Sequence, residues 1–529
     1  MIFLKKRAVT VFFLLSAFFI FLGFRTADIA SDVQAAAISG SGMRFDIAEL
    51  RGTVYDCNLR PLTNSETLYK AVAKPTQKAM AALEKELNAA EFLQAKEKML
   101  AGEAVCVDVD SDSCDGQDIC VISYPKRYSS YACHVIGYCG FDGGGVSGAE
   151  KAFDGQLESG RVTVTARIET DANGRVLVGE KIEVQNSEFP AQGVVLTVDG
   201  DIQKAVEDAL DSSGAQCAAA MVIDVETGAI KACVSRPAFD QYDIASALDN
   251  PDSPLINRAF LPFSVGSVFK TVVAAAALEN GIGSDFSYEC TGSVTLNGVT
   301  FSCHKKDGHG VLDMKGAVAN SCNTYFIALA LETGAQNIVE TAEKFGFGRE
   351  TFFADGMISR SGNLPQKVDS KAATANLSFG QGELTATPVQ ICAMMAAVAN
   401  GGYYVEPYLV EGEVGADGVF VKRHSYSERK QVITAETAEQ LQKFLAAVVE
   451  EGSGKRAKSD VVACSGKTAT AQTGRFDEDG EIYNAWFAGY FPAESPKYAV
   501  VILKEDGGEG AISCAPVFKE IAEQITVLN

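Results

Sequence analysis

Three short patterns carry residue types that could support nucleophilic catalysis. The first is Ser267-Val-Phe-Lys270, which precedes an apolar, alanine-rich run ending at Asn280-Gly281. Such a run with a glycine stop predicts a buried helix, on which residues three apart share one face. A serine hydroxyl is a weak nucleophile unless a base lies beside it, and a buried lysine with a lowered pKa can be that base. The first pattern therefore predicts Ser267 as nucleophile and Lys270 as its base.

Two other segments match the same pattern. Ser123-Tyr-Pro-Lys126 contains a proline, which argues against a helix that would bring its serine and lysine together. Ser427-Glu-Arg-Lys430 lies in a charged stretch that predicts an exposed face. The apolar helix that follows Ser267 therefore selects it over the other two.

The second pattern is Ser321-Cys-Asn323, directly before an apolar helical run that ends at Gly334. Serine and asparagine are also good helix-capping residues, so capping is the alternative interpretation. Ser361-Gly-Asn363 has the same spacing, but it lies in a polar loop that no apolar helix follows. Ser321 and Asn323 are therefore the second pair of candidates.

The third pattern is Lys467-Thr-Ala469, within a strand-like run. A phosphate-binding loop is excluded, because Val461 stands where that loop requires a glycine five residues before Gly466. The structural alternative is an exposed lysine and threonine on an edge strand. The order S-x-x-K, S-x-N and K-T-x is far more specific than any one of the patterns.

Strand-like runs at both ends of the region must position these patterns. Two early runs, 218–225 and 229–234, flank a turn at Glu226-Thr-Gly228. The late runs are 461–471, 485–490 and 498–504, and a helix over 516–527 follows them. Because helical sequence fills the interval, we expect one antiparallel sheet assembled from both ends.

Length and composition bound the class of protein. The 529 residues allow about three or four domains. Hydrophobic residues make up 47% and charged residues 22%, which is ordinary globular usage. With 46 Lys and Arg against 68 Asp and Glu, the formal net charge is −22, which would repel a phosphate backbone. Nucleic acid is therefore not an expected partner.

The first 25 residues predict a membrane anchor. Lys5-Lys6-Arg7 precedes the uncharged stretch Ala8–Phe24, which would form about 26 Å of helix at about 1.5 Å per residue. The basic cluster favours a cytoplasmic N-terminus, so the chain beyond residue 26 is expected outside. Ala35-Ala36-Ala37 offers a cleavage pattern, but it lies well past the apolar core, so an uncleaved anchor is favoured.

The 14 cysteines of an exported chain suggest disulfides. Cys290 and Cys303 flank a predicted hairpin around Asn297-Gly298 and are the pair we predict, although an anaerobic source could leave thiols reduced. The sequence does not predict a zinc site, because the chain has no C-x-x-C pair, no H-E-x-x-H motif and only four histidines. We expect neither a metal nor a cofactor.

In their order and context, the three patterns resemble those of class B penicillin-binding proteins, the monofunctional peptidoglycan D,D-transpeptidases. The resemblance extends from Arg51-Gly-Thr-Val-Tyr-Asp56 to Ala515-Pro-Val-Phe-Lys519. Segments between them that also resemble the family are His134–Tyr138, Gly145–Glu150, Asn257–Ala259, Phe379–Gly382, Thr387–Gln390, Gly401-Gly402 and Trp486–Tyr490.

The resemblance implies an α+β fold. Its penicillin-binding transpeptidase domain would hold an antiparallel five-stranded sheet with helices and an all-helical subdomain. A membrane anchor and an elongated, mixed α/β pedestal module would precede it. We therefore expect a cytoplasmic tip and transmembrane anchor at 1–25, a non-catalytic, dimerisation or pedestal-like module at 26–190, and the transpeptidase domain at 191–529. Within this module, the sequence of residues 76–100 predicts one helix.

The resemblance also implies roles in acylation. Ser267 would attack the carbonyl between the two terminal D-alanines of a peptidoglycan stem peptide, which releases D-alanine and leaves an acyl-enzyme for a neighbouring amine. Lys270 would be the base, with Lys467 as the cation that lowers its pKa. Ser321 would relay a proton to the leaving amine.

Further positions would bind the substrate. Asn323 would hold a substrate amide, Lys467 and Thr468 the terminal carboxylate, and the backbone N–H groups of Ser267 and Thr470 the oxyanion. β-Lactams would acylate Ser267. The implied location is the bacterial cell membrane, with one span and an extracytoplasmic catalytic domain, and a polytopic glycan polymerase is the partner implied.

Two positions depart from the family pattern. Ala469 stands where the third pattern usually ends in glycine, which places a methyl group beside the strand that the substrate would line. Alternate strand positions point away from a ligand, so activity need not be lost. Val265 stands where many relatives carry proline, and we expect it to affect only the start of the helix.

The same motifs leave other outcomes open. Hydrolysis would make the chain a D,D-carboxypeptidase or a β-lactamase-like enzyme, although the large N-terminal module favours a transpeptidase. An inactive scaffold of the cell-wall synthesis complex is the alternative that is not an enzyme, and the intact motifs argue against it. A bifunctional enzyme is disfavoured, because the chain has no E-D-x-x-F glycosyltransferase motif.

Overall fold

A computed structural model describes residues 15–26, 42–129, 131–171, 173–186, 191–425, 427–478 and 480–528. The chain divides into two compact units. The first comprises Met1–Leu50, Glu66–Lys126 and Arg161–Phe189, and the second comprises Arg51–Ser65, Arg127–Gly160 and Pro190–Asn529. The expected domain boundaries after residues 25 and 190 stay predictions.

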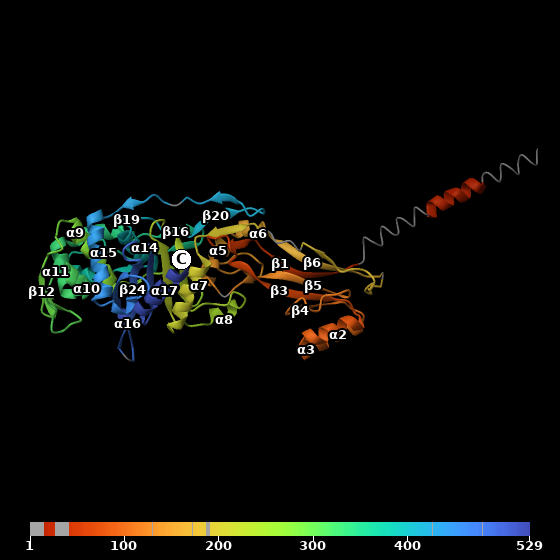
Figure 1. The fold of residues 1–529 in the computed structure, drawn as a ribbon, viewed down its shortest axis with the longest axis horizontal. Helices are drawn as coiled ribbons and strands as arrows, with labels where there is room; N and C mark the ends of the chain where they lie inside the picture. The colour runs from red at the N-terminus through yellow and green to blue at the C-terminus, as the bar shows by residue number, and fades with distance from the viewer. Residues whose placement is uncertain are drawn as a thin grey trace, which may run out of the picture. The chain divides into compact units, whose positions relative to one another are not determined.

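Residues 15–26 form a helix (Figure 1). Across the described parts of the chain, no helix combines the length and the apolar character needed to cross a membrane. The expected anchor begins at Ala8, so part of it lies outside the described residues.

The first unit is built around two sheets and two helices. One sheet has the order β1 (Gly42–Leu50), β6 (Val162–Glu169), β7 (Glu183–Gln185), and the other has the order β4 (Val105–Val109), β3 (Thr63–Ala73), β5 (Ile119–Tyr128). The segment predicted as one helix forms two, α2 (Gln77–Glu86) and α3 (Ala89–Leu100). The break has a local cause, because Asn88 caps α3 and forms a capping box with Glu91. Leu83 and Met99 then pack in one core with the sheet.

A five-stranded antiparallel sheet organises the second unit, as predicted. Its order is β10 (Ile230–Arg236), β9 (Ala218–Asp224), β25 (Tyr498–Lys504), β24 (Gly480–Phe491), β23 (Ser465–Asp477). The early hairpin therefore pairs with the latest strand, and the strand that carries Lys467 lies at the sheet edge. An edge strand leaves backbone groups that can pair with an added chain.

Helices cover both faces of this sheet (Figure 1). Alternate residues of β9 enter different cores: Ala220 and Val222 pack with α7 (Gly200–Ser212) and α17 (Ala515–Leu528), while Met221 and Ile223 pack with α14 (Pro388–Ala399). This period of two is what a strand buried on both faces requires.

A helical region adjoins the sheet and carries the first two patterns. Its helices are α9 (Lys270–Glu279), α10 (Met314–Ala319), α11 (Asn323–Thr333), α12 (Ala335–Lys344), α13 (Lys371–Ser378) and α15 (Ala435–Glu450). Between α9 and α10 the chain is not helical. It forms two short antiparallel pairs, β12 (Tyr288–Cys290) with β15 (Gly310–Leu312) and β13 (Ser293–Leu296) with β14 (Val299–Ser302).

Smaller elements complete the second unit. A four-stranded sheet has the order β2 (Thr53–Tyr55), β8 (Gly193–Leu196), β20 (Val410–Val414), β21 (Phe420–Arg423). Three strand pairs are β11 (Phe263–Ser264) with β18 (Thr385–Ala386), β16 (Thr351–Ala354) with β17 (Met357–Ser359), and β19 (Tyr403–Tyr404) with β22 (Lys430–Gln431). Short helices are α4 (Cys133–Ile136), α5 (Gly148–Ala152), α6 (Asp154–Glu158), α8 (Ile244–Leu248) and α16 (Gly510–Ser513).

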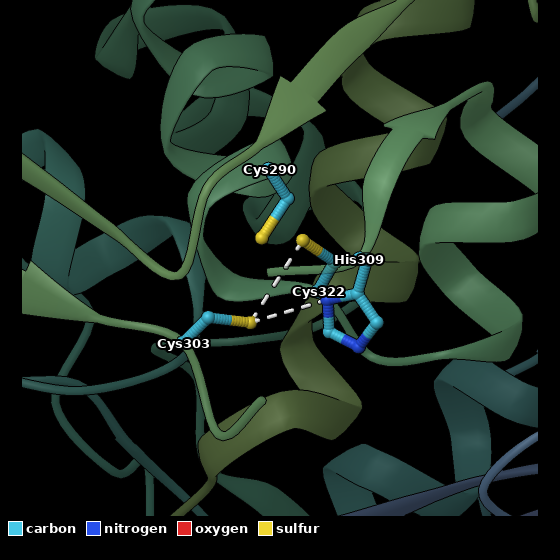
Figure 2. A group of neighbouring side chains, drawn as sticks. All are labelled: Cys290, Cys303, His309 and Cys322. Atoms are coloured by element: carbon cyan, nitrogen blue, oxygen red, sulfur yellow. Dashed lines mark hydrogen bonds between the residues drawn. The ribbon is translucent and has the colours of Figure 1, made fainter. Parts of the chain in front are cut away.

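The predicted disulfide between Cys290 and Cys303 is wrong, because both thiols are free. Cys303 Sγ instead lies 3.9 Å from Cys322 Sγ and 3.5 Å from His309 Nδ1 (Figure 2). The hairpin was located correctly, since β13 and β14 flank Asn297-Gly298, but the thiols at its base face a third cysteine and a histidine.

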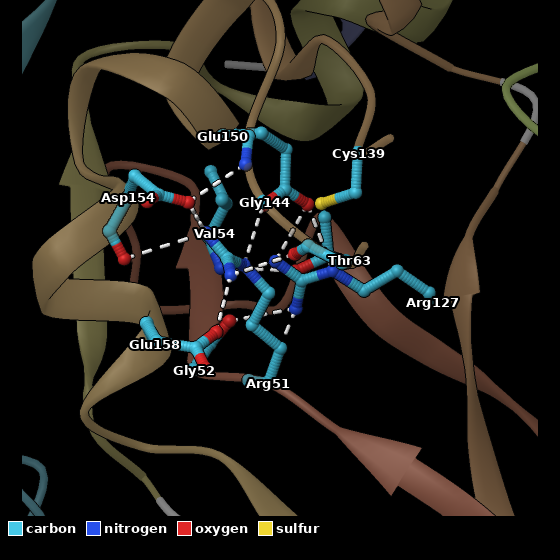
Figure 3. Close-up of polar contacts among 12 residues, drawn as sticks. Arg51, Gly52, Val54, Thr63, Arg127, Cys139, Gly144, Glu150, Asp154 and Glu158 are labelled. Carbon is cyan, nitrogen blue, oxygen red and sulfur yellow. Dashed lines mark hydrogen bonds and ion pairs between the residues drawn. The ribbon is translucent and has the colours of Figure 1, made fainter. Parts of the chain in front are cut away.

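A buried ion-pair cluster ties the first family-like segment to the second unit (Figure 3). Arg51 Nε lies 3.1 Å from Glu150 Oε2, and Arg127 Nη2 lies 2.6 Å from Glu150 Oε1. Arg51 also pairs with Asp154 and Glu158. The Glu150 side chain is fully buried, so its charge depends on both guanidinium groups. These pairs join 51–65 to 127–160 within the second unit.

Candidate active site

Ser267 lies in a 3₁₀ turn (Gly266–Phe269) that leads directly into α9, and Lys270 is the first residue of that helix. The serine is partly exposed, whereas the lysine is fully buried. The expected single helix is thus a 3₁₀ turn followed by an α-helix, and the pair remains one turn apart. Lys270 Nζ donates to Ser321 and Asn323, and no hydrogen bond joins it to Ser267 Oγ among the described residues.

The turn that presents Ser267 requires glycine at position 266. Gly266 has φ +63°, and a Cβ there would lie 3.0 Å from Ala471 Cβ and 3.4 Å from Ala469 Cβ. Its N–H donates to the carbonyl of Gly380 at 2.9 Å. The turn therefore packs closely on β23, which places the serine beside the strand that carries Lys467.

The second pattern lies between α10 and α11. Ser321 has φ +51°, an uncommon backbone conformation for a residue with a side chain. Its Oγ accepts from Lys270 Nζ at 3.2 Å and from Lys467 Nζ at 2.9 Å. Asn323 begins α11, and its Oδ1 accepts from Lys270 Nζ at 2.7 Å. The capping interpretation does not hold for these two side chains, because both accept a hydrogen bond from Lys270 and neither caps α11.

The third pattern lies on the edge strand β23. Lys467 is fully buried and, besides Ser321 Oγ, donates to the Thr468 carbonyl at 3.0 Å. The Thr468 hydroxyl lies 3.0 Å from Ser453 Oγ, and Thr470 Oγ1 accepts from the Gly510 N–H at 3.3 Å. Ala469 is buried, and its methyl group packs towards the Gly266 turn.

A cavity of about 330 Å³ opens beside these groups. Its lining includes Ser267, Ser321, Asn323, Thr468, Ala469 and Thr470, together with His304, Ser453, Glu509 and Ala511. Sequence reasoning missed the last four. Ser453 and Glu509 belong to no motif. Ser453 follows α15 and Glu509 directly precedes α16, and both helices contact β23.

The pKa of each lysine is lowered. Burial lowers the pKa of Lys270 to about 7, and the nearby Cys322 and Cys303 oppose that lowering. Burial also lowers the pKa of Lys467 well below its ordinary value, and the charge of Lys270 lowers it further. Because this repulsion is mutual, a charge on either lysine disfavours a charge on the other. Two buried amines bridged by one hydroxyl favour a state in which one is neutral.

The other matches to the patterns lie elsewhere. Ser123 is exposed on strand β5, and Ser427 is exposed between β21 and β22. Neither lines the cavity. Of the three serines with this spacing to a lysine, Ser267 is the one that lines the cavity.

Comparisons with known proteins agree with this geometry. Residues 218–523 match the family described as the penicillin binding protein transpeptidase domain. Stage V sporulation protein D of Bacillus subtilis is 32% identical over 406 residues, which cover 74% of this chain and 60% of that protein. The chain thus spans less than two thirds of that relative's length.

Solved structures extend the match. The D,D-transpeptidase domain of a peptidoglycan glycosyltransferase from Eggerthella lenta superposes with a TM-score of 0.66 at 26% identity, covering 90% of this chain and 98% of that one. Penicillin binding protein 3 of Mycobacterium tuberculosis, solved with aztreonam, gives 0.65 at 27% identity, with coverage of 92% and 97%. The chain belongs to the penicillin-binding protein transpeptidase domain family.

Proposed function

We propose that the chain is a serine D,D-transpeptidase that cross-links peptidoglycan stem peptides and is acylated by β-lactams. The observation that carries this proposal is the convergence of three distant patterns on one cavity, where Ser321 Oγ accepts from both Lys270 and Lys467. The D,D-transpeptidase and aztreonam-bound structures similar to this chain support the same activity.

In acylation, Ser267 Oγ forms a bond to the carbonyl carbon between the two terminal D-alanines. Its proton passes to Lys270, whose lowered pKa leaves a fraction neutral near pH 7. The carbon–nitrogen bond then breaks, and D-alanine leaves after its amine has taken a proton. Ser321 lies within hydrogen-bond distance of both lysines and would deliver that proton. An amine of a second stem peptide later displaces Ser267 and returns the hydroxyl.

The remaining groups would bind and orient the substrate. The edge position of β23 suits a peptide that adds alongside the strand. Lys467 and Thr468 would hold the terminal carboxylate, and Asn323 a substrate amide. The backbone N–H groups of Ser267 and Thr470 would stabilise the oxyanion, an interaction whose loss typically costs about 3 kcal/mol.

The N-terminal part is proposed to anchor and space this domain. Residues 1–25 would place the N-terminus in the cytoplasm and cross the bacterial membrane once, and residues 26–190 would form a pedestal beneath an extracytoplasmic transpeptidase domain at 191–529. The basic cluster before an uncharged stretch supports the anchor. A polytopic glycan polymerase is the proposed partner, because a cross-linking enzyme requires newly made glycan chains.

Labelling with a fluorescent penicillin tests the proposal. The full-length chain should form a stable adduct on Ser267, located by peptide mass mapping, and Ser267→Ala should form none. Ser427→Ala is the matched control, since it removes an exposed serine with the same spacing to a lysine. A folded wild-type chain that forms no adduct would favour the inactive scaffold.

Product analysis separates transfer from hydrolysis. With a stem-peptide donor and an amine acceptor, a transpeptidase gives the cross-linked product, whereas a D,D-carboxypeptidase gives only the shortened peptide and D-alanine. Shortened peptide alone, at saturating acceptor, would contradict the transfer reaction and leave the acyl-enzyme intact.

A further inference from the structure

Four side chains with metal-binding atoms converge beside the second pattern (Figure 2). Cys290 ends β12, Cys303 follows β14, His309 precedes β15 and Cys322 precedes α11. One ligand atom from each lies within 4.8 Å of every other. The three cysteines are buried and the histidine is partly exposed. Four segments that are separate in the sequence thus direct sulfur and nitrogen atoms at one point.

The distances fit a tetrahedral metal. Zinc binds thiolate sulfur at about 2.3 Å and histidine nitrogen at about 2.1 Å, which sets a sulfur–sulfur edge of about 3.8 Å and a sulfur–nitrogen edge of about 3.6 Å. Cys303 Sγ lies 3.9 Å from Cys322 Sγ and 3.5 Å from His309 Nδ1. These separations are too long for a disulfide and suit two ligands of one ion.

The backbone around the cluster is folded to hold it. Cys290 pairs with Gly310 in the β12–β15 ladder, which places it beside His309. A Cβ at Gly292 would lie 1.9 Å from the Lys306 carbonyl, and one at Gly308 would lie 2.1 Å from the Cys290 carbonyl. The two loops therefore cross at a distance that only glycine permits.

This crossing has little apolar support. The strand residues of the β13–β14 hairpin are exposed or partly exposed, and none of these eight residues is buried. A segment that buries so little of its own surface is commonly stabilised by a disulfide or a metal. Since the three cysteines are free thiols, no disulfide stabilises this segment, and a bound metal is the remaining cross-link.

We propose that Cys290, Cys303, His309 and Cys322 bind one zinc ion in a closed structural site. Four protein ligands leave no position for water or substrate, and three sulfur atoms with one nitrogen favour zinc over magnesium or calcium. Binding requires three thiolates, so uptake of the ion releases the protons of the thiols that were protonated. A search for short cysteine pairs missed this site, because its ligands are spread from residue 290 to residue 322.

The site also has a consequence for the cavity, which rests on the proposed function. Cys322 stands between Ser321 and Asn323, the two acceptors of Lys270. A metal bond at Cys322 Sγ would fix the backbone on both sides, including the left-handed Ser321. Loss of the ion should therefore misplace both acceptors, and displacements of about 1 Å can slow a reaction about 100-fold.

Metal analysis of the full-length chain tests the proposal. Protein purified without chelator should contain one zinc per chain by mass spectrometry, with X-ray absorption showing three sulfur neighbours and one nitrogen. Cys290→Ser and His309→Ala should lose the zinc. Cys233→Ser, a buried cysteine outside the cluster, and His304→Gln, next to a ligand, should keep it.

The outcomes are separable. If Cys290→Ser does not fold, His309→Ala and chelation of the wild type give the same comparison in protein whose fold is checked by the fluorescence of Trp486. The proposal is overturned if reduced wild-type protein neither contains zinc nor takes it up. It is also overturned by a Cys290–Cys303 disulfide, by iron in place of zinc, or by a His309→Ala variant that holds as much zinc as the wild type.

A last comparison distinguishes this site from the proposed activity. Ser267→Ala should keep its zinc, and zinc-free wild type should acylate about 10- to 100-fold more slowly. Zinc without penicillin labelling would count against the proposed function alone. Normal labelling of protein that never binds zinc would count against the metal site alone.

Discussion

The rate at which a β-lactam acylates Ser267 should depend on pH through Lys270. Burial lowers the pKa of this lysine to about 7, and only the neutral amine can accept the serine proton. The rate should therefore fall as pH drops below about 7, because the amine becomes protonated, and reach a plateau above it. An ordinary lysine, with a pKa near 10.4, would still be almost fully protonated across this range.

The size of the effect follows from the titration curve. With a pKa of about 7, about 9% of Lys270 is neutral at pH 6 and about 91% at pH 8, so the rate should rise about tenfold between them. Below pH 6 the rate should change about tenfold for each pH unit.

Stopped-flow acylation with a fluorescent penicillin between pH 5 and 9 measures this profile. Trp486, the single tryptophan of the chain, is buried and donates to the Ser264 carbonyl at 3.0 Å, so its fluorescence reports whether the site stays folded. A rate that is flat between pH 6 and 8 while that fluorescence is unchanged would refute Lys270 as the base. A rate that keeps rising tenfold per unit up to pH 9 would show an unshifted lysine.

Four further predictions follow from the geometry. Glu150→Gln should destabilise the chain by about 3 to 5 kcal/mol, because it leaves the buried Arg51 and the partly buried Arg127 without their shared carboxylate. Glu158→Gln, at a side chain 43% exposed, should cost under about 1 kcal/mol, and chemical denaturation that ranks the two variants equally would contradict the cluster. Gly266→Ala should slow acylation far more than Gly281→Ala, since both positions have positive φ but only the first meets Ala471; equal penicillin-labelling rates would exclude the steric explanation. Ala469→Gly should change the acylation rate, because it removes the methyl group on which the Ser267 turn packs, and an unchanged rate would show that this methyl is irrelevant. Ser321→Gly and Ser321→Ala should both slow acylation. In thermal unfolding the glycine variant should be the more stable of the two by about 1 kcal/mol, because residue 321 has φ +51°, and equal stabilities would argue against backbone strain.

The sheet and the catalytic patterns could be predicted because their signals are local. A short apolar run predicts each strand of the sheet. Ser267, Ser321 and Lys467 each lie in or next to a helix or strand that the hydrophobic pattern predicts. The two-sided burial of β9 and β25 also follows from continuous apolar sequence. The distances between the catalytic side chains could not be predicted, since they depend on the loops that bring positions 270, 321 and 467 together.

The wrong disulfide prediction comes from a contact between distant segments, whereas the wrongly predicted single helix has a local cause. Cys290 and Cys303 looked like a pair because they flank one hairpin, but Cys322 approaches them from the start of α11. Asn88 broke a predicted helix through a capping box that its spacing to Glu91 could have revealed.

Ser321 is the residue where these separate contacts meet. A left-handed serine costs about 1 to 3 kcal/mol, so surrounding contacts must hold it. Its N–H donates to the Val318 carbonyl at 3.2 Å, and the next N–H, of Cys322, donates to the Ala317 carbonyl at 3.0 Å. Its Oγ accepts from two buried lysines. Because the end of α10, the start of α11 and the edge strand all constrain this one residue, its hydroxyl is fixed between both amines before any substrate binds, which is the preorganisation that proton transfer requires.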